Sequence, residues 1–215
     1  MTSSATSAAP AAPSDMPLVA ILRGLDVDAA VAVGQALFDA GFRLLEVPLN
    51  RPGALECITR LAAIAPPDAL VGAGTVLSVA DVDAVHAAGG QLIVSPNCNP
   101  AVIHRSVATG LFSAPGIATP TEAFAALEAG AHALKIFPAE QVGTAGLKAL
   151  LSVLPSSTPI WPVGGITPES MAGWVKAGAT GFGIGGQLYA PGTPADQVKV
   201  RAEGFVAAWK ACRVG

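Results

Sequence analysis

Short apolar runs alternate with alanine-rich stretches along the chain from Leu18 onward. Each run has the length of a buried strand, and each is followed by a loop and then by a helical stretch that closes near a glycine. This order predicts parallel strands joined by right-handed helical crossovers. The apolar runs are LVAIL (18–22), RLLEV (43–47), LVGAG (70–74), QLIVS (91–95), LFSAP (111–115), ALKIF (133–137), IWPVG (160–164) and TGFGI (180–184).

Several helical stretches carry a start signal. Ser78, Thr119 and Thr167 each stand directly before one, where a side-chain hydroxyl can cap the first free backbone amides. We therefore expect helices to begin at these three residues. The other helices are expected to begin near Asp26, Gly53, Pro100, Gly143 and Thr193.

Eight strand–helix units in about 200 residues predict a single α/β domain, a (β/α)8 TIM barrel, over residues 17–215. The rival architecture is an open doubly wound sheet, which the lack of a GxGxxG-type first turn makes the weaker option. Residues 1–16 are rich in Ala, Ser, Thr and Pro, so we expect a disordered tail there. The same segment lacks the basic start and the apolar stretch of a secretory signal.

Charge and cysteine content narrow the partners and the compartment. The net charge is −3 and the basic residues are scattered, which argues against nucleic acid or an anionic membrane as a partner. No apolar stretch approaches the roughly 18 residues of a membrane-spanning helix. Cys57, Cys98 and Cys212 are odd in number and far apart, so we expect reduced thiols and a cytoplasmic protein. Any bound phosphate must then be held by a few local groups.

Strand alternation places one lysine and one carboxylate in the same interior. Successive side chains of a barrel strand point alternately toward the interior and toward the helices. The residues expected against the helices are Leu134, Ile136, Leu45 and Val47; those expected inside are Ala133, Lys135, Phe137, Leu44 and Glu46. Lys135 and Glu46 therefore face one lumen near the carboxyl ends of their strands, where barrel enzymes hold their active sites.

An inward lysine has two interpretations, and the residues alone leave them about even. Lys135 is either half of a buried ion pair with Glu46 or an amine whose pKa burial lowers until it attacks a carbonyl. Its position late in a strand favours catalysis. Glu46 can be a counter-ion and a general acid–base at once.

Two glycine pairs close the last two strands, Gly164–Gly165 and Gly185–Gly186. They are either tight turns that need a positive φ or a phosphate site, because the loops after strands 7 and 8 of a barrel commonly bind phosphate through backbone amides. Both interpretations stay open.

Other polar residues carry weaker signals. Arg23 and Thr75 stand just past strands 1 and 3, where each is either a loop cap or a donor to an anion. Arg51 follows strand 2 and is expected near the surface. His86, His104 and His132 fall on helices or on a helix-facing position, so they do not form the ligand set of a catalytic zinc, and we expect no metal.

Taken together, eight motifs resemble the class I aldolases that act on 2-dehydro-3-deoxy-6-phospho sugar acids. The resemblance covers nearly all of residues 18–209. Its motifs are AILRG (20–24), LEVPLN (45–50), GAGTVL (72–77), LIVSPN (92–97), PGIATPTEAF (115–124), LKIFPAE (134–140), PVGGI (162–166) and GFGIGGQLY (181–189).

The resemblance implies cleavage of such an acid to pyruvate and glyceraldehyde 3-phosphate by a homotrimer that needs no added cofactor. It implies that Lys135 forms the Schiff base and that Glu46 moves the protons. The residues implied in substrate contact are Arg23, Thr75, Pro96 and Phe137, and those implied in phosphate binding are Gly164, Gly165, Gly185 and Gly186.

Two positions bear on the substrate. Asn50 resembles the galactonate branch, because the gluconate branch has an arginine there, although Arg51 puts an arginine one position later. Gly186 stands where the family commonly has serine. The alternatives are a gluconate-type aldolase, an isomerase or epimerase that uses Lys135 and Glu46 without a covalent link, and a barrel that only binds sugar phosphates.

Overall fold

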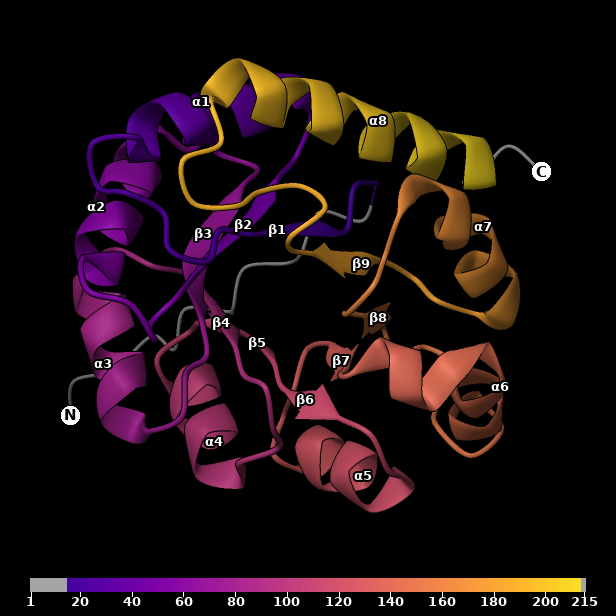
Figure 1. Ribbon diagram of the computed structural model, residues 1–215. Helices are drawn as coiled ribbons and strands as arrows, with labels where there is room; N and C mark the ends of the chain where they lie inside the picture. The colour runs from indigo at the N-terminus through magenta and orange to yellow at the C-terminus, as the bar shows by residue number, and fades with distance from the viewer. Residues whose placement is uncertain (1–14, 214–215) are drawn as a thin grey trace, which may run out of the picture.

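The computed structural model describes residues 15–213, and within them parallel strands lie inside a surround of helices (Figure 1). No helix among these residues is long and apolar enough to cross a membrane. The strands are β1 Leu18–Ile21, β2 Leu44–Pro48, β3 Leu70–Gly74, β4 Leu92–Val94, β5 Phe112–Ala114, β6 Gly116–Ile117, β7 Leu134–Ile136, β8 Ile160–Pro162 and β9 Phe182–Ile184. The helices are α1 Ala30–Ala40, α2 Ala54–Ile64, α3 Val79–Ala87, α4 Pro100–Ala108, α5 Pro120–Glu128, α6 Ala139–Leu151, α7 Pro168–Ala177 and α8 Ala195–Arg213.

The strands follow one another in space as they do in the chain. One sheet has the order β5-β4-β3-β2-β1-β9 and the other the order β6-β7-β8, and every pairing between these strands is parallel. The last strand pairs with the first, Ala20 opposite Ile184. This order excludes the doubly wound sheet, in which the strand order reverses beside the first strand.

The fifth strand, expected over residues 111–115, is followed directly by a further short strand, β6, and Pro115 separates the two. β5 pairs with β4 and β6 pairs with β7, while Pro115 stands between them. Proline has no backbone N–H to continue a ladder. Hydrogen bonds still link the two sheets here, from the Lys135 amide to the Pro115 carbonyl at 2.9 Å. On the other side a single bridge joins Val163 to Gly183.

The alternation of inward and outward side chains is confirmed. Leu45, Val47, Leu134 and Ile136 belong to the large apolar cluster between strands and helices. A second, smaller cluster fills the space that the strands enclose. It contains Val19, Leu44, Leu70, Leu92, Val94, Phe112, Ala114, Ala133 and Trp161. The chain therefore has two apolar layers, one on each face of the strands, and charged groups that face inward are surrounded by the second.

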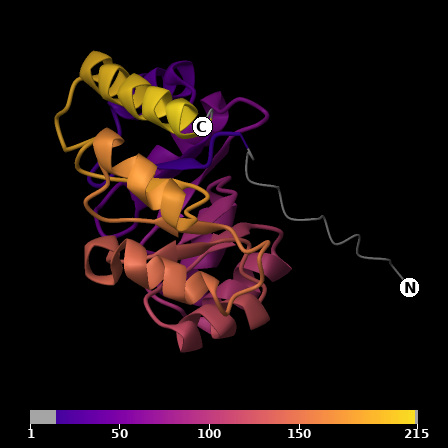
Figure 2. The same ribbon diagram turned by 90° about the vertical axis from the view of Figure 1, so that its right-hand side faces the viewer.

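The expected caps are confirmed and two helix starts differ. Ser78, Thr119 and Thr167 each form a reciprocal capping box with the residue three positions later. α1 begins four residues after Asp26. α6 begins at Ala139, four residues before Gly143. Gly143 has a φ of 67° and a ψ of 171°, which are not helical, so α6 is kinked at this residue. Figure 2 shows α6, α7 and α8 stacked along one side of the molecule.

The tail expected over residues 1–16 lies outside the described residues, except for its last two. Met16 packs against the outer apolar cluster, and the Asp15 carbonyl accepts a hydrogen bond of 2.9 Å from Trp209 Nε1 in α8. The start of the described chain is thus held by its last helix. Cys57, Cys98 and Cys212 are free thiols, as expected.

Removal of a capping hydroxyl tests the local logic of the helices. In α5 the Glu122 amide donates to Thr119 Oγ1, and Glu122 Oε2 accepts from the Thr119 amide. Thr119→Ala leaves one helical amide without its acceptor, so we expect the free energy of unfolding to fall by about 1 kcal/mol. Urea denaturation measures this loss. Thr119→Ser keeps the hydroxyl and is the control; an equal loss in both variants would contradict the capping role.

Candidate active site

Lys135 lies in the middle of β7, and its side chain is 7% exposed. Burial is the main cause that lowers the pKa of this amine, and the Arg23 charge lowers it further, while the Glu46 charge opposes both. The amine is therefore shifted toward the neutral form that attacks carbonyl groups. This placement on an inward strand position is the one expected from the sequence.

Glu46 lies in β2 and is 2% exposed. Burial raises the pKa of this carboxyl group from its ordinary value of 4.5 to about 7, against the charges of Lys135 and Arg23, which lower it. Glu46 Oε2 is the one buried side-chain oxygen or nitrogen in residues 15–213 without a hydrogen-bond partner. A carboxyl group with a pKa near neutrality and a free oxygen is suited to give and take protons.

The two groups share a small cavity without forming an ion pair. Lys135 and Glu46 both line it, together with residues of the inner apolar cluster and with Ile21, Val163 and Gly183. None of the ion pairs within the described chain joins Lys135 to Glu46. The cavity measures about 10 Å³, which is close to the space one water needs. The ion-pair interpretation is therefore not supported by a direct contact, and a water between the groups fits.

A much larger cavity of about 460 Å³ opens at the carboxyl ends of the strands. Its size is that of a small-molecule site. Ile21, Val163 and Gly183 line both cavities, so the large one adjoins the small one. Of the residues expected in the site, it is lined by Arg23, Phe137, Gly164, Gly165, Gly185 and Gly186, and also by Arg51.

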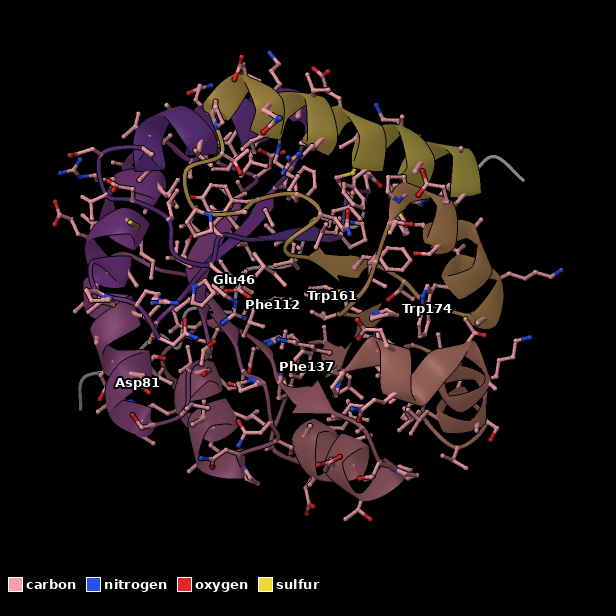
Figure 3. All side chains as sticks on the ribbon, in the orientation of Figure 1. Glu46, Asp81, Phe112, Phe137, Trp161 and Trp174 are labelled. Atoms are coloured by element: carbon pink, nitrogen blue, oxygen red, sulfur yellow. The ribbon has the colours of Figure 1, made fainter. Side chains whose placement is uncertain are left out.

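Phe137 lines the large cavity and contacts Lys135, which lines the small one. Its ring centroid lies 4.8 Å from Lys135 Nζ, and 36% of the residue is exposed. An aromatic face at this distance attracts a cation. Figure 3 shows Glu46, Phe112, Trp161 and Phe137 toward the middle of the molecule, whereas Asp81 and Trp174 lie with the surrounding helices.

The two glycine pairs differ in whether the structure requires glycine. Gly164 and Gly165 have φ values of 118° and 62°, so the tight-turn interpretation holds for this pair. A β-carbon at either residue would also collide with the Glu140 carboxylate. Gly185 and Gly186 do not have positive φ values, and a β-carbon at Gly186 would meet open space. The tight-turn interpretation is therefore wrong for the second pair.

Thr75 and Pro96 do not line either cavity. Thr75 directly follows β3 and has a φ of 57°, a strained conformation for a β-branched residue. Pro96 follows β4, and its carbonyl lies where a β-carbon at Gly116 would have to be.

Three residues in or beside the site carried no clear signal in the sequence. Gly74, at the end of β3, touches the Glu46 carboxylate so closely that a β-carbon would overlap Oε2. Glu140 packs against the Gly164–Gly165 turn. Arg51 faces the large cavity instead of only the surface. Gly74 is the second glycine of the GAGTVL motif, and this motif is the signal that could have found it. The motif begins on β3, the strand next to the β2 strand that carries Glu46.

The histidines fall as expected with one exception. His86 and His104 lie in α3 and α4. His132 does not face the helices: its ring stacks on Phe112 of the inner cluster, and its Nδ1 accepts a hydrogen bond of 3.0 Å from the Ser113 amide. His132 therefore packs against the inner apolar cluster. It lies two residues before the start of β7. Within residues 15–213, no His, Cys, Asp and Glu side chains gather as a metal-ligand group.

Comparison with known proteins places this site in a family. A family model described as KDPG and KHG aldolase matches residues 12–200. The protein of Escherichia coli (strain K12) named 2-dehydro-3-deoxy-6-phosphogalactonate aldolase is 47% identical over 195 residues, which are 91% of this chain and 95% of that protein. A solved structure described as native KDPGal superimposes with a TM-score of 0.91 at 46% identity over 93% of this chain and 97% of that chain.

A more distant structure bears on the chemistry. KDPG aldolase from Legionella pneumophila, with pyruvate captured as a covalent carbinolamine intermediate, has a TM-score of 0.76 at 26% identity and covers 92% of this chain and 94% of its own. A buried amine and a buried carboxyl group beneath a cavity suit an enzyme that uses the amine as a nucleophile. The chain belongs to the KDPG and KHG aldolase family of class I aldolases, which are lyases.

The raised pKa of Glu46 makes a stability prediction. The folded protein keeps a proton on Glu46 up to about pH 7, whereas the unfolded chain releases it near pH 4.5. The folded state thus binds more protons in this interval, so the free energy of unfolding falls as pH rises through it. Relative to Glu46→Gln, the wild type should lose about 3 kcal/mol between pH 4 and pH 8.

Urea denaturation of both proteins across this pH range measures the difference. The exposed Glu128→Gln variant controls for the loss of a carboxylate elsewhere. A difference between wild type and Glu46→Gln that stays constant with pH would contradict the raised pKa.

Proposed function

We propose that this aldolase cleaves 2-dehydro-3-deoxy-6-phosphogalactonate to pyruvate and D-glyceraldehyde 3-phosphate through a Schiff base on Lys135. The single observation that carries the proposal is a buried lysine with a lowered pKa that shares a water-sized cavity with a buried carboxyl group. The covalent pyruvate adduct of the Legionella relative supports the covalent step.

The first half of the reaction forms the imine. The neutral Lys135 amine attacks the C2 ketone and gives a carbinolamine. Protonated Glu46, through the water that fits beside it, donates a proton to the departing hydroxyl group, and water leaves. The product is a protonated imine, and Glu46 is then a carboxylate. The Phe137 ring, 4.8 Å from the nitrogen, favours this cation.

The second half breaks the carbon–carbon bond. The Glu46 carboxylate accepts the proton of the C4 hydroxyl group, C3–C4 breaks, and the bonding electrons move into the imine to form an enamine. Glyceraldehyde 3-phosphate leaves, and protonated Glu46 returns a proton to C3. Water adds to the protonated imine, the Glu46 carboxylate accepts the proton that is released, and pyruvate and the free amine are formed. A pKa of about 7 lets one carboxyl group serve in both directions near neutral pH.

Both anionic ends of the substrate have a place in this proposal. Arg23 lines the large cavity and influences the pKa of both Lys135 and Glu46, so it is near enough to receive the C1 carboxylate. Phe137, which lines this cavity, is proposed to contact the same end, as are Thr75 and Pro96, which follow the carboxyl ends of β3 and β4 although they line neither cavity. The C6 phosphate is proposed to bind the amides of Gly164, Gly165, Gly185 and Gly186. Among the backbone hydrogen bonds outside the helices and strands of residues 15–213, none is donated by the Gly185 or Gly186 amide.

The wider setting of the protein is also a proposal. We interpret the strand order, with the last strand paired to the first, as a closed (β/α)8 barrel. The three free thiols support a reducing compartment, the cytoplasm. A homotrimer follows from the resemblance, and exposed apolar side chains such as Leu77, Val79 and Phe124 are suited to a subunit contact.

Reductive trapping tests the covalent step. Incubation with pyruvate and borohydride should add one reduced pyruvyl group to the chain at Lys135, which mass spectrometry of the intact protein and its peptides detects. Lys135→Met should stay unmodified, whereas Lys148→Met, which removes an exposed lysine of α6, should be labelled like the wild type. A wild-type chain that stays unmodified would refute the imine and favour an isomerase or epimerase.

The stereochemistry of the substrate is tested by its two C4 epimers. Cleavage of the 6-phosphogalactonate and 6-phosphogluconate forms can be followed by coupled detection of pyruvate. We expect a higher kcat/KM for the galactonate epimer, on the strength of Asn50 and of the 47% identical E. coli relative. A preference for the gluconate epimer would assign the enzyme to the other branch.

A further inference from the structure

Arg51 is a cation of the large cavity that the reaction above does not use. It follows β2, the strand that carries Glu46, and it lines the large cavity together with Gly165 and Gly186. Within residues 15–213 its guanidinium group takes part in no ion pair and no hydrogen bond. Its charge and its donors are therefore available to a ligand in the cavity.

The two arginines of the cavity lie at different distances from the reacting groups. Arg23 is among the charges that lower the pKa of both Lys135 and Glu46, and Arg51 is not among the charges that shift either pKa. Electrostatic influence falls with distance. Arg51 is therefore the outer cation and Arg23 the inner one. The surface hollow that Arg51 shares with Asp26 and Pro52 also places it at the rim.

The proposed substrate needs a cation at that rim. The C2 carbon of the substrate must reach Lys135, which puts the C1 carboxylate beside Arg23. The C6 phosphate then lies at the opposite end of the substrate, toward the rim of the cavity. The glycine amides there are neutral donors. The Glu140 carboxylate is close to this end, because it packs against the Gly164–Gly165 turn. A phosphate dianion meets repulsion from this carboxylate unless a cation offsets it.

From this arrangement we propose that Arg51 binds the substrate's C6 phosphate and sets the preference for phosphorylated over unphosphorylated sugar acids. The planar guanidinium fork of Arg51 matches two phosphate oxygens. This proposal deepens the proposed function and rests on it.

The test compares two substrates that differ only in the phosphate, 2-dehydro-3-deoxy-6-phosphogalactonate and 2-dehydro-3-deoxygalactonate. The measured quantity is the ratio of their kcat/KM values. Arg51→Ala should lower this ratio about 10- to 100-fold, through a higher KM for the phosphorylated acid. Arg51→Lys keeps the charge but not the planar guanidinium fork, so its ratio should fall between that of the wild type and that of Arg51→Ala.

Two controls separate the possible failures. Arg201→Ala removes an arginine of α8 that lines neither cavity, and its ratio should equal that of the wild type. Trapping of pyruvate by borohydride in Arg51→Ala shows whether Lys135 still reacts in a folded protein. If the wild type neither traps pyruvate nor cleaves either acid, the proposed function fails. If the wild type is active but Arg51→Ala keeps the wild-type ratio, or loses both activities in equal proportion, the role of Arg51 is refuted.

Discussion

Burial of one amine and one carboxyl group among apolar side chains is the constraint on which the rest of this structure depends. Removal of a charge from water is costly, so the folded protein moves the pKa of Glu46 up to about 7 and that of Lys135 down. The same desolvation therefore favours the neutral form of both groups. Burial of Lys135 and Glu46 is thus the physical cause both of their shifted pKa values, on which the proposed catalysis depends, and of a lower free energy of unfolding.

The two apolar layers make this burial possible. The outer layer, between strands and helices, holds the strands in place, while the inner layer surrounds Lys135 and Glu46 with Val94, Ala114 and Trp161. Gly74 lets the Glu46 carboxylate fill space that a side chain would occupy. Because the small cavity admits about one water, protons can move between Glu46 and a ligand without opening the interior to solvent.

In the proposed function, the large cavity binds the two anionic ends of the substrate with different groups. Arg23 is assigned to the end near the reacting groups, and the glycine turns with Arg51 are assigned to the end at the rim; all of these residues line the cavity. Gly164 and Gly165 are constrained by their φ values and by Glu140, whereas Gly186 faces open space. The first turn therefore requires glycine for structural reasons, whereas a β-carbon at Gly186 would be accommodated.

Local pattern was sufficient for the elements, the caps and the side on which each strand residue lies, because these follow from periodicity and short-range hydrogen bonding. Lys135 and Glu46 were identified this way. Sequence could not show that Pro115 splits a strand between two sheets, that the His132 ring stacks on the inner cluster, or that Arg51 lines the large cavity. These facts depend on contacts between residues far apart in the chain. Only the tertiary structure decides how close two buried charges come and what solvent reaches them, and that distance separates an ion pair from a reactive amine.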